Sequence, residues 1–242
     1  MMTVIKKTLA LLLFLSSVLS LEAQISSAKI TYERKTNLYK RWKKNDYVQR
    51  WIKEEDKIKI DYFELFITDS CSLFRPQENE LKENYSWTVT KNTVYQFPTK
   101  NSCYLIKSMW GEELHLTDTL QKRTWQITQS TRKIAGYVCR KAIWQPDDST
   151  RIYAWFSYDI TPSSGPERFS DLPGTILGIA TEDGGIVYFA KKIEILKSEA
   201  SLFIPPKKKK IYTVTELKAE LTKQYSFEKW FKEALEMNFG IW

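Results

Sequence analysis

Apolar and polar residues alternate over most of this chain, with the period of two that marks a β-strand half-buried on a core. Residues 28–33, 57–62 and 123–128 show the pattern most clearly. Each segment has one apolar and one polar face. We therefore expect the apolar faces to pack against a core on one side of an antiparallel sheet.

Shorter alternating or apolar runs predict further strands at 63–68, 72–75, 87–90, 93–97, 103–109, 137–144, 151–156, 175–181 and 186–196. Turn residues separate several of these strands, at 135–136, 146–149 and 182–185. The last run, Glu-Asp-Gly-Gly, predicts a hairpin.

Helix signals occur only near the end of the chain. Thr213 and Glu216 form a capping box, which predicts a helix start. An apolar stripe at helical spacing follows, and Gly240 is a plausible stop; the stripe comprises Phe227, Trp230, Phe231, Ala234 and Leu235. This stripe either packs a helix on the sheet or lays a basic amphipathic helix on a membrane surface.

Together these patterns predict a mainly β fold: an antiparallel, strongly curved sheet or a flattened sandwich, with C-terminal helices. We expect a signal peptide at 1–23, an antiparallel β domain at 24–212, and a helical segment at 213–242 packed on the β domain.

A Pro-Gly turn stands out within the β region. Leu172, Pro173 and Gly174 precede an apolar run, with Gly165 and Pro166 just upstream. Because Pro fixes φ and Gly accepts positive φ, the sequence predicts a type II turn followed by a buried strand. The segment 159–174 is then either a structural turn that steers the chain into the sheet or a rigid loop that docks a partner.

Residues 1–23 have a basic start, a short apolar core and a small residue at Ala23, as secretory signals do. We expect cleavage after Ala23, with Ser20 as the alternative. No later apolar run has the roughly 20 residues of a membrane span. The mature chain is therefore expected to lack a transmembrane segment and to be exported, either periplasmic or associated with an outer membrane.

The chain has 37 basic and 29 acidic residues, a net charge of +8. This excess favours anionic neighbours, but charges of both signs are spread along the chain, which argues against a nucleic acid partner. Pro205, Pro206 and four lysines form one low-complexity segment. It is either a solvated connector or an anionic contact through Lys207, Lys208, Lys209 and Lys210.

Familiar catalytic and cofactor signatures are missing from the sequence. His115 is the only histidine, and its alternating surroundings predict an outward strand residue, so we expect neither a zinc site nor a histidine-dependent centre. There is no Gly-x-Ser-x-Gly elbow and no phosphate-binding glycine loop. We therefore assign no catalytic, cofactor-binding or metal residues.

Two weaker signals point to sugars or peptides. We expect six carboxylates near turns or strand ends to be ordinary surface residues, although they could in principle include a glycosidase pair: Glu112, Glu113, Asp159, Glu167, Asp171 and Asp183. The chain also has nine tryptophans. We expect Trp125, Trp144 and Trp155 to pack in the core and Trp42, Trp51 and Trp87 to be more exposed, since their surroundings are more polar.

From about residue 63 onward the sequence resembles the GLPGLI family of exported Bacteroidota proteins. The resemblance rests on the motif at 171–176 and on the segments 72–74, 113–120, 125–128, 133–142, 154–160 and 165–166. The family implies no established reaction. Asp171 stands where the family usually has Gly, and Asp tolerates the left-handed region better than most residues.

Three cysteines allow one disulfide and three pairings. In the GLPGLI family the cysteine resembling Cys139 often stands alone. The resemblance therefore implies a disulfide between Cys71 and Cys103.

The sequence favours an exported, noncatalytic envelope protein that acts as a binding or accessory module for an outer-membrane or periplasmic assembly, with an envelope protein as its partner. The first alternative is a carrier of a lipid-like or anionic ligand in an apolar groove. The second alternative is a hydrolase without a recognisable motif.

Overall fold

The structure of the chain is a computed structural model that describes residues 24–77, 85–196 and 200–240. In these ranges twelve strands form one sheet, in the order β12-β6-β5-β4-β3-β2-β1-β11-β10-β9-β8-β7. The strands are β1 (Ala28–Asn37), β2 (Ile58–Ile67), β3 (Ser72–Pro76), β4 (Thr93–Phe97), β5 (Ser102–Met109), β6 (Glu112–Thr119), β7 (Gln126–Ile134), β8 (Tyr137–Asp147), β9 (Thr150–Ser157), β10 (Thr175–Thr181), β11 (Ile186–Ile195) and β12 (Tyr212–Thr213).

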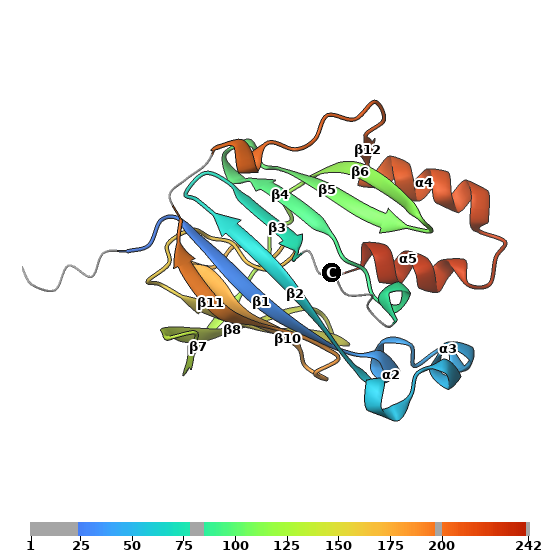
Figure 1. The fold of residues 1–242 in the computed structure, drawn as a ribbon, viewed down its shortest axis with the longest axis horizontal. Coiled ribbons are helices and arrows are strands. Elements are labelled where there is room, and N and C mark those ends of the chain that lie inside the picture. Colours follow the sequence, from blue (N-terminus) through green and yellow to red (C-terminus); the bar gives the residue numbers. More distant parts are fainter. Residues whose placement is uncertain (1–23, 78–84, 197–199, 241–242) are drawn as a thin grey trace, which may run out of the picture.

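The sheet is strongly twisted and does not close, and the half from β7 to β11 turns away from the half from β2 to β6 (Figure 1). Neighbouring strands are antiparallel except for β12, which pairs in parallel with β6 at Tyr212 and Thr213. The prediction of a mainly β fold with a strongly curved sheet and C-terminal helices is confirmed. The sheet is mixed because of the short strand β12, which the sequence pattern did not predict.

Two C-terminal helices, α4 (Val214–Tyr225) and α5 (Phe231–Phe239), lie beside β5 and β6 (Figure 1). The predicted capping box is present, with Thr213 accepting from the Glu216 amide and Glu216 accepting from the Thr213 amide. Leu217, Leu221 and Phe231 are buried against the core of the sheet. Phe227 precedes α5 and is 77% exposed, so the buried stripe is shorter than the sequence predicts.

The expectation that helices occur only at the end is wrong. Two short helices, α2 (Leu38–Arg41) and α3 (Asp46–Trp51), follow β1. The side chains of Asn37 and Asn45 cap them. These helices are too short to show an apolar period, so the asparagine caps were their only sequence signal. Single 3-10 turns occur at η1 (Glu54–Asp56), η2 (Ser86–Thr88), η3 (Pro98–Lys100) and η4 (Ala200–Phe203).

None of the helices in the described part of the chain has the length and apolar character needed to cross a membrane.

The alternation in β2 is present, but its predicted direction is wrong for residues 57–62. Ile58, Ile60 and Tyr62 are 41%, 46% and 38% exposed, whereas Lys59 and Asp61 are buried. The reason is the phase of the strand, because Phe63 and the core residues after it share a face with Lys59 and Asp61. Charged side chains therefore enter the concave interior of the sheet.

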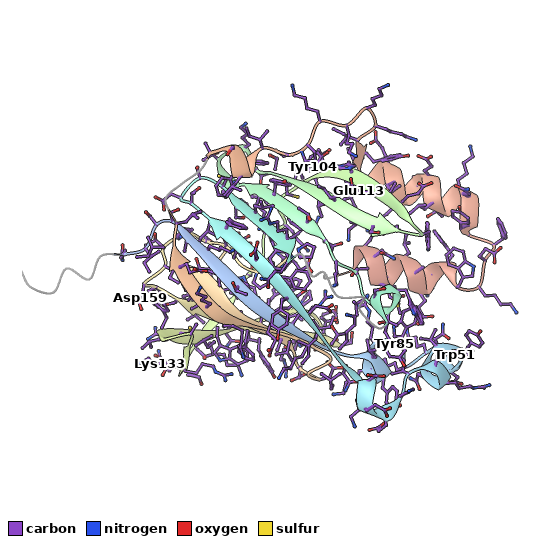
Figure 2. All side chains as sticks on the ribbon, viewed as in Figure 1. Trp51, Tyr85, Tyr104, Glu113, Lys133 and Asp159 are labelled. Atoms are coloured by element: carbon purple, nitrogen blue, oxygen red, sulfur yellow. The ribbon has the colours of Figure 1, made fainter. Side chains whose placement is uncertain are left out.

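His115 is also placed differently from the prediction, since it is only 3% exposed. Its Nδ1 lies 2.9 Å from the Tyr104 hydroxyl and its Nε2 lies 2.7 Å from Glu113. The connector from β11 to β12 covers this face, and the Tyr104 hydroxyl lies 3.2 Å from the Pro206 carbonyl (Figure 2). The connector, which is distant in sequence, thus buries His115, although the alternation within β6 predicts an exposed residue there.

The lysine run in the same connector is exposed along its whole length. Lys208 pairs with Glu113 at 3.3 Å and Lys210 with Glu220 at 3.7 Å. Surface pairs of this kind contribute little to stability. The run is a solvated connector, and its contact with an anionic surface stays a prediction.

Candidate functional site

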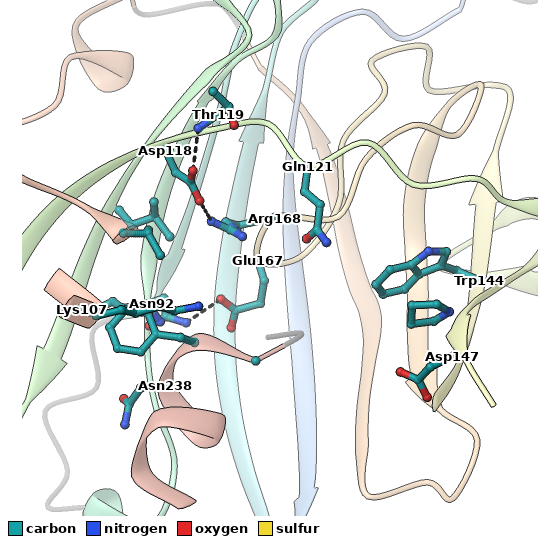
Figure 3. Close-up of a pocket in the computed structure, with 16 residues that line it drawn as sticks. Asn92, Lys107, Asp118, Thr119, Gln121, Trp144, Asp147, Glu167, Arg168 and Asn238 are labelled. Atoms are coloured by element: carbon teal, nitrogen blue, oxygen red, sulfur yellow. Dashed lines mark hydrogen bonds and ion pairs between the residues drawn. The ribbon is translucent and has the colours of Figure 1, made fainter. Parts of the chain in front are cut away.

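A cavity of about 510 Å³ lies between the sheet and the C-terminal helices. Figure 3 shows its walls. One wall comes from β5 and β6, another from the end of β8, and helices α4 and α5 close it. We call it the polar cavity. Its lining includes Asn92, Lys107, Asp118, Trp144, Glu167 and Arg168.

The loop between β9 and β10 carries Glu167 and Arg168 into the polar cavity. The Pro166 carbonyl accepts from the Phe169 amide at 3.1 Å, which closes a turn with Glu167 and Arg168 at its centre. Glu167 has φ +56, a left-handed conformation that few non-glycine residues adopt. Phe169 behind the turn is fully buried and anchors it.

The five residues predicted as a docking loop or structural turn belong to this same loop. Gly165, Pro166, Leu172 and Gly174 are buried, and Pro173 is exposed. A Cβ on Gly165 would lie 2.8 Å from the Cβ of Ile176, so the loop packs directly on β10. The structure therefore places four of the five in the interior, next to the residues that line the polar cavity.

The turn at Pro173 is not the predicted type II turn. The Gly174 amide donates to the Leu172 carbonyl at 2.8 Å, and the Thr175 amide donates to Ile160 instead of to Leu172. A three-residue turn results, because the Ile160 carbonyl takes the Thr175 amide that a type II turn needs. Asp171 has φ +70, the left-handed conformation that Asp tolerates, and the predicted buried strand follows as β10.

A continuous line of polar side chains runs from the polar cavity into the sheet. Lys107 donates to the Asn92 Oδ1 at 3.0 Å, and Asn92 donates to Glu167 at 3.0 Å (Figure 3). The other Glu167 oxygen accepts from the Tyr188 hydroxyl at 2.8 Å. Arg34 lies 3.3 Å from that hydroxyl and forms an ion pair with buried Asp61 at 2.8 Å. Each of these groups holds its neighbour in one orientation.

Lys107 is a buried cation at the end of this line. It is 4% exposed, and Asn92 links its ammonium to the Glu167 carboxylate. Burial lowers the pKa of the Lys107 ammonium to about 8, against the attraction of Glu167. A hydrogen-bond donor with this pKa, held inside a cavity, is typical of a functional site.

The opposite part of the cavity combines an ion pair with aromatic rings. Asp118 accepts from Arg168 at 2.8 Å, and Asp118 Oδ1 also accepts from the Thr119 amide. Trp144 is 8% exposed and forms part of the wall (Figure 3). Arg123 packs beneath its ring, 5.1 Å from the centroid, and donates to the Arg168 carbonyl at 2.9 Å. The hydrogen bond from Arg123 therefore fixes the loop that bears Arg168.

This arrangement is suited to holding a polar, uncharged ligand with apolar patches. Positively and negatively charged side chains, which donate and accept hydrogen bonds, line the cavity beside the rings of Trp144 and Phe239. Such a mixture provides orientation through hydrogen bonds and contact area through aromatic surfaces. Within the described residues, no group of three or more His, Cys, Asp and Glu side chains gathers as metal ligands would.

The carboxylates suggested by sequence are mostly separated from one another. Glu167 lines the polar cavity, whereas Glu113 bonds His115 on the outer face and Asp183 lies beside α2. Asp118 and Asp147, which are not among the six carboxylates suggested by sequence, line the same cavity as Glu167 (Figure 3).

The predicted disulfide partners are not brought together. Cys71 precedes β3 and Cys103 lies on β5, with β4 between them. Two strand spacings put their Cα atoms about 9–10 Å apart, beyond the usual limit of about 7 Å for a disulfide. They also face opposite sides of the sheet, and all three cysteines are free thiols.

Lys107, Asn92, Arg34 and Asp61 were missed as functional residues, although their signal was present in the sequence. Lys107 has the same strand phase as the core residues Cys103, Leu105 and Met109. Asp61 has the same phase as Phe63 and Leu65. A charged residue in phase with a core face indicates a buried polar site.

The chain forms a curved, open β-sheet domain, with the polar cavity as a preformed candidate binding site between the sheet and the C-terminal helices. The chain belongs to the family described as "N-glycanase peptide, N-terminal domain", whose profile matches residues 30–219. A search of curated proteins finds no match.

Two solved structures of PNGF-II have a similar fold. The one in space group C2 is 20% identical, with a TM-score of 0.55 over 84% of this chain and 33% of that chain. The one in space group P21 is 17% identical, with a TM-score of 0.56 over 82% of this chain and 33% of that chain. The chain thus spans about a third of the length of these proteins, and at this identity the likeness is one of fold.

The family match overturns the GLPGLI assignment. The segments that suggested it are alternating strands and Gly-Pro turns, which antiparallel sheets share widely. It also overturns the expectation of a noncatalytic envelope module that is not an enzyme, since the family is named for N-glycanases. The predicted signal peptide at 1–23 lies outside the described residues, and export stays a prediction from the sequence.

Proposed function

We propose that this chain recognises the glycan of N-linked glycoproteins in the polar cavity and takes part in removing it. The observation that carries the proposal is the cavity itself, in which Lys107, Asn92, Glu167, Asp118 and Arg168 are held in fixed orientations beside aromatic rings. Sugars present hydroxyl groups and apolar C–H faces together, which matches this lining. Membership of an N-glycanase family supports the choice of ligand.

We further propose that the chain meets its glycoprotein in the periplasm or at the outer membrane. Its predicted export and its basic surface support this placement. An envelope glycoprotein is then the expected partner.

Binding is tested by calorimetric titration with an N-glycopeptide and with the same peptide after deglycosylation. We expect only the glycopeptide to bind. Lys107→Met should weaken binding about 10-fold or more, because a hydrogen bond to a charged donor contributes about 1.5–3 kcal/mol.

The matched control is Lys133→Met, which makes the same substitution at an exposed position on β7 (Figure 2). It should leave the affinity unchanged. Equal binding of both peptides, or equal affinity of the two variants for the glycopeptide, would contradict the proposal.

Hydrolysis by this chain itself is a second candidate, favoured by the conformation of Glu167. The backbone of Glu167 itself has φ +56, and Asn92 holds its carboxylate at the cavity. Backbone strain of this kind concentrates at functional sites. Incubation of the protein with the glycopeptide should then release free glycan, and Glu167→Gln should reduce the release about 100-fold or more. Absence of release by the unmodified protein would reject this candidate and leave the binding proposal standing on the titration.

A further inference from the structure

A second cavity, of about 680 Å³, lies on the other side of α5 and is ringed by tryptophans. Its lining includes Trp42, Trp87, Trp110 and Trp230. We call it the tryptophan cavity. Its volume lies within the range of about 300–1,000 Å³ that is usual for small-ligand sites.

Trp110 occupies a position where a tryptophan is unfavourable for folding. Met109 pairs with Glu112 across the hairpin from β5 to β6, so Trp110 and Gly111 form a two-residue turn. Their φ angles are +51 and +85, as a type I′ turn requires, and Asn, Asp or Gly is preferred at the first position. Trp110 is nevertheless 52% exposed, so burial returns only part of its conformational cost. An exposed aromatic ring at a strained position indicates a binding role.

Two of the other rings are also exposed, whereas Trp42 is half-buried and donates from its Nε1 to the Thr88 carbonyl at 3.1 Å. Trp87 is 59% exposed and Trp230 is 43% exposed. The centroids of Trp110 and Trp230 are 5.6 Å apart at an interplanar angle of 75°, and those of Trp42 and Trp87 are 6.0 Å apart. Two pairs of indoles thus border one hollow. Exposed aromatic surface gathered in this way marks an interaction site.

Polar groups complete the lining. Asn45, Lys91, Glu233 and Asn238 border the same cavity. Aromatic faces with a few polar side chains suit a pyranose ring, which stacks its C–H face on an indole and directs its equatorial hydroxyls sideways.

We propose that the tryptophan cavity is a second carbohydrate subsite, which takes β-linked pyranose units with equatorial hydroxyl groups, such as N-acetylglucosamine. Asn238 lines both cavities, so α5 is their common wall. A glycan held in the polar cavity can therefore continue across the end of α5 into the tryptophan cavity. This inference rests on the proposed function, because it treats the same glycan as the ligand.

The test is a titration with a tetramer of β-1,4-linked N-acetylglucosamine, followed by calorimetry and by tryptophan fluorescence. Trp110→Asn should weaken binding about 2- to 10-fold, the change that corresponds to an aromatic contact of about 0.5–1.5 kcal/mol. Asparagine favours the type I′ turn, so this variant keeps the hairpin. Trp230→Ala provides a second variant, with a similar expected loss. Trp51→Ala is the matched control, because Trp51 is 62% exposed and lies outside the cavity lining.

The outcomes separate this inference from the proposed function. Unchanged affinity in both Trp110→Asn and Trp230→Ala would overturn the subsite, even if Lys107→Met abolished binding. Loss in the tryptophan variants with no effect of Lys107→Met would support the subsite and contradict the polar cavity as the glycan site. Equal losses for a sugar-free peptide would assign the tryptophans to peptide binding and overturn the inference.

Discussion

Gly174→Ala is expected to lower the free energy of unfolding by about 4 kcal/mol, near the upper end of single substitutions. Gly174 has φ +141, which L side chains rarely adopt. A Cβ at this position would overlap the Ser157 carbonyl oxygen and lie 2.9 Å from its carbon and 3.3 Å from the Ile160 oxygen. These are backbone atoms at the end of β9 and in the loop that follows it, so these segments or the start of β10 would have to shift.

Thermal unfolding measures this effect. For a chain of this size a loss of about 4 kcal/mol lowers the Tm by roughly 8–16 °C. The control is Gly184→Ala, where φ is +67 but no atom lies within 4 Å of the added Cβ. That variant should lose only about 1 kcal/mol, from backbone strain alone. An unchanged Tm for Gly174→Ala together with loss of a partner protein would instead identify a docking loop.

Asp61→Ala is expected to destabilise the fold by about 3–5 kcal/mol, the usual effect of removing one partner from a buried ion pair. The Asp61 side chain is fully buried and lies 2.8 Å from Arg34, 2.7 Å from Lys59 and 3.1 Å from Lys91. Without the carboxylate, three buried or half-buried cations would face one another. The line of polar contacts that ends at Glu167 would lose its anchor at Arg34.

The same carboxylate gives the stability a defined acid dependence. Burial raises the pKa of Asp61, but Arg34 and the hydrogen bonds from Lys59 and Arg34 outweigh burial and lower it from 3.8 to about 2. Because the folded-state pKa is the lower one, the stabilisation is complete above about pH 4 and is lost as the pH falls toward 2. This window corresponds to about 2 kcal/mol.

Urea unfolding at pH 5 and at pH 2.5 tests both parts of this prediction. The difference in unfolding free energy between the unmodified protein and Asp61→Ala should be large at pH 5 and smaller at pH 2.5. Asp148→Ala removes an exposed carboxylate and should change stability by less than about 0.5 kcal/mol at either pH. A pH-independent difference for Asp61→Ala would mean that its carboxyl group is not held by the buried cations.

Local pattern was sufficient to predict most of the strands and the capped start of α4, because both depend on the spacing of side chains within one segment. It was wrong at 87–90, where the 3-10 turn η2 replaces the expected strand, and it did not predict β12. It predicted the alternation of residues 57–62 but not which face is buried. That choice depends on Phe63 and on the register with β1, where Asp61 pairs with Arg34. Charged residues inside a sheet depart from the usual preference for apolar interiors, and such departures are expected at functional sites.

The candidate site itself was only partly predictable. Glu167 was among the six carboxylates suggested by sequence, and Gly165 and Pro166 pointed to the loop that presents it. Asn92, Lys107 and Asp118 come from strands or loops far from position 167, and only the curvature of the sheet brings them to one cavity (Figure 3). His115 was misjudged for a similar reason, because the segment that covers it comes from the distant connector.

The central claim is that the polar cavity holds the glycan, and NMR of the tryptophan indole N–H groups tests it most directly. The chain has nine tryptophans, and Trp144 lies in the wall of the polar cavity while Trp51 lies outside both cavities. On titration with an N-glycopeptide, the Trp144 signal should shift and the Trp51 signal should not, and the deglycosylated peptide should shift neither. A Trp144 signal that stays unchanged at saturating glycopeptide would contradict the account.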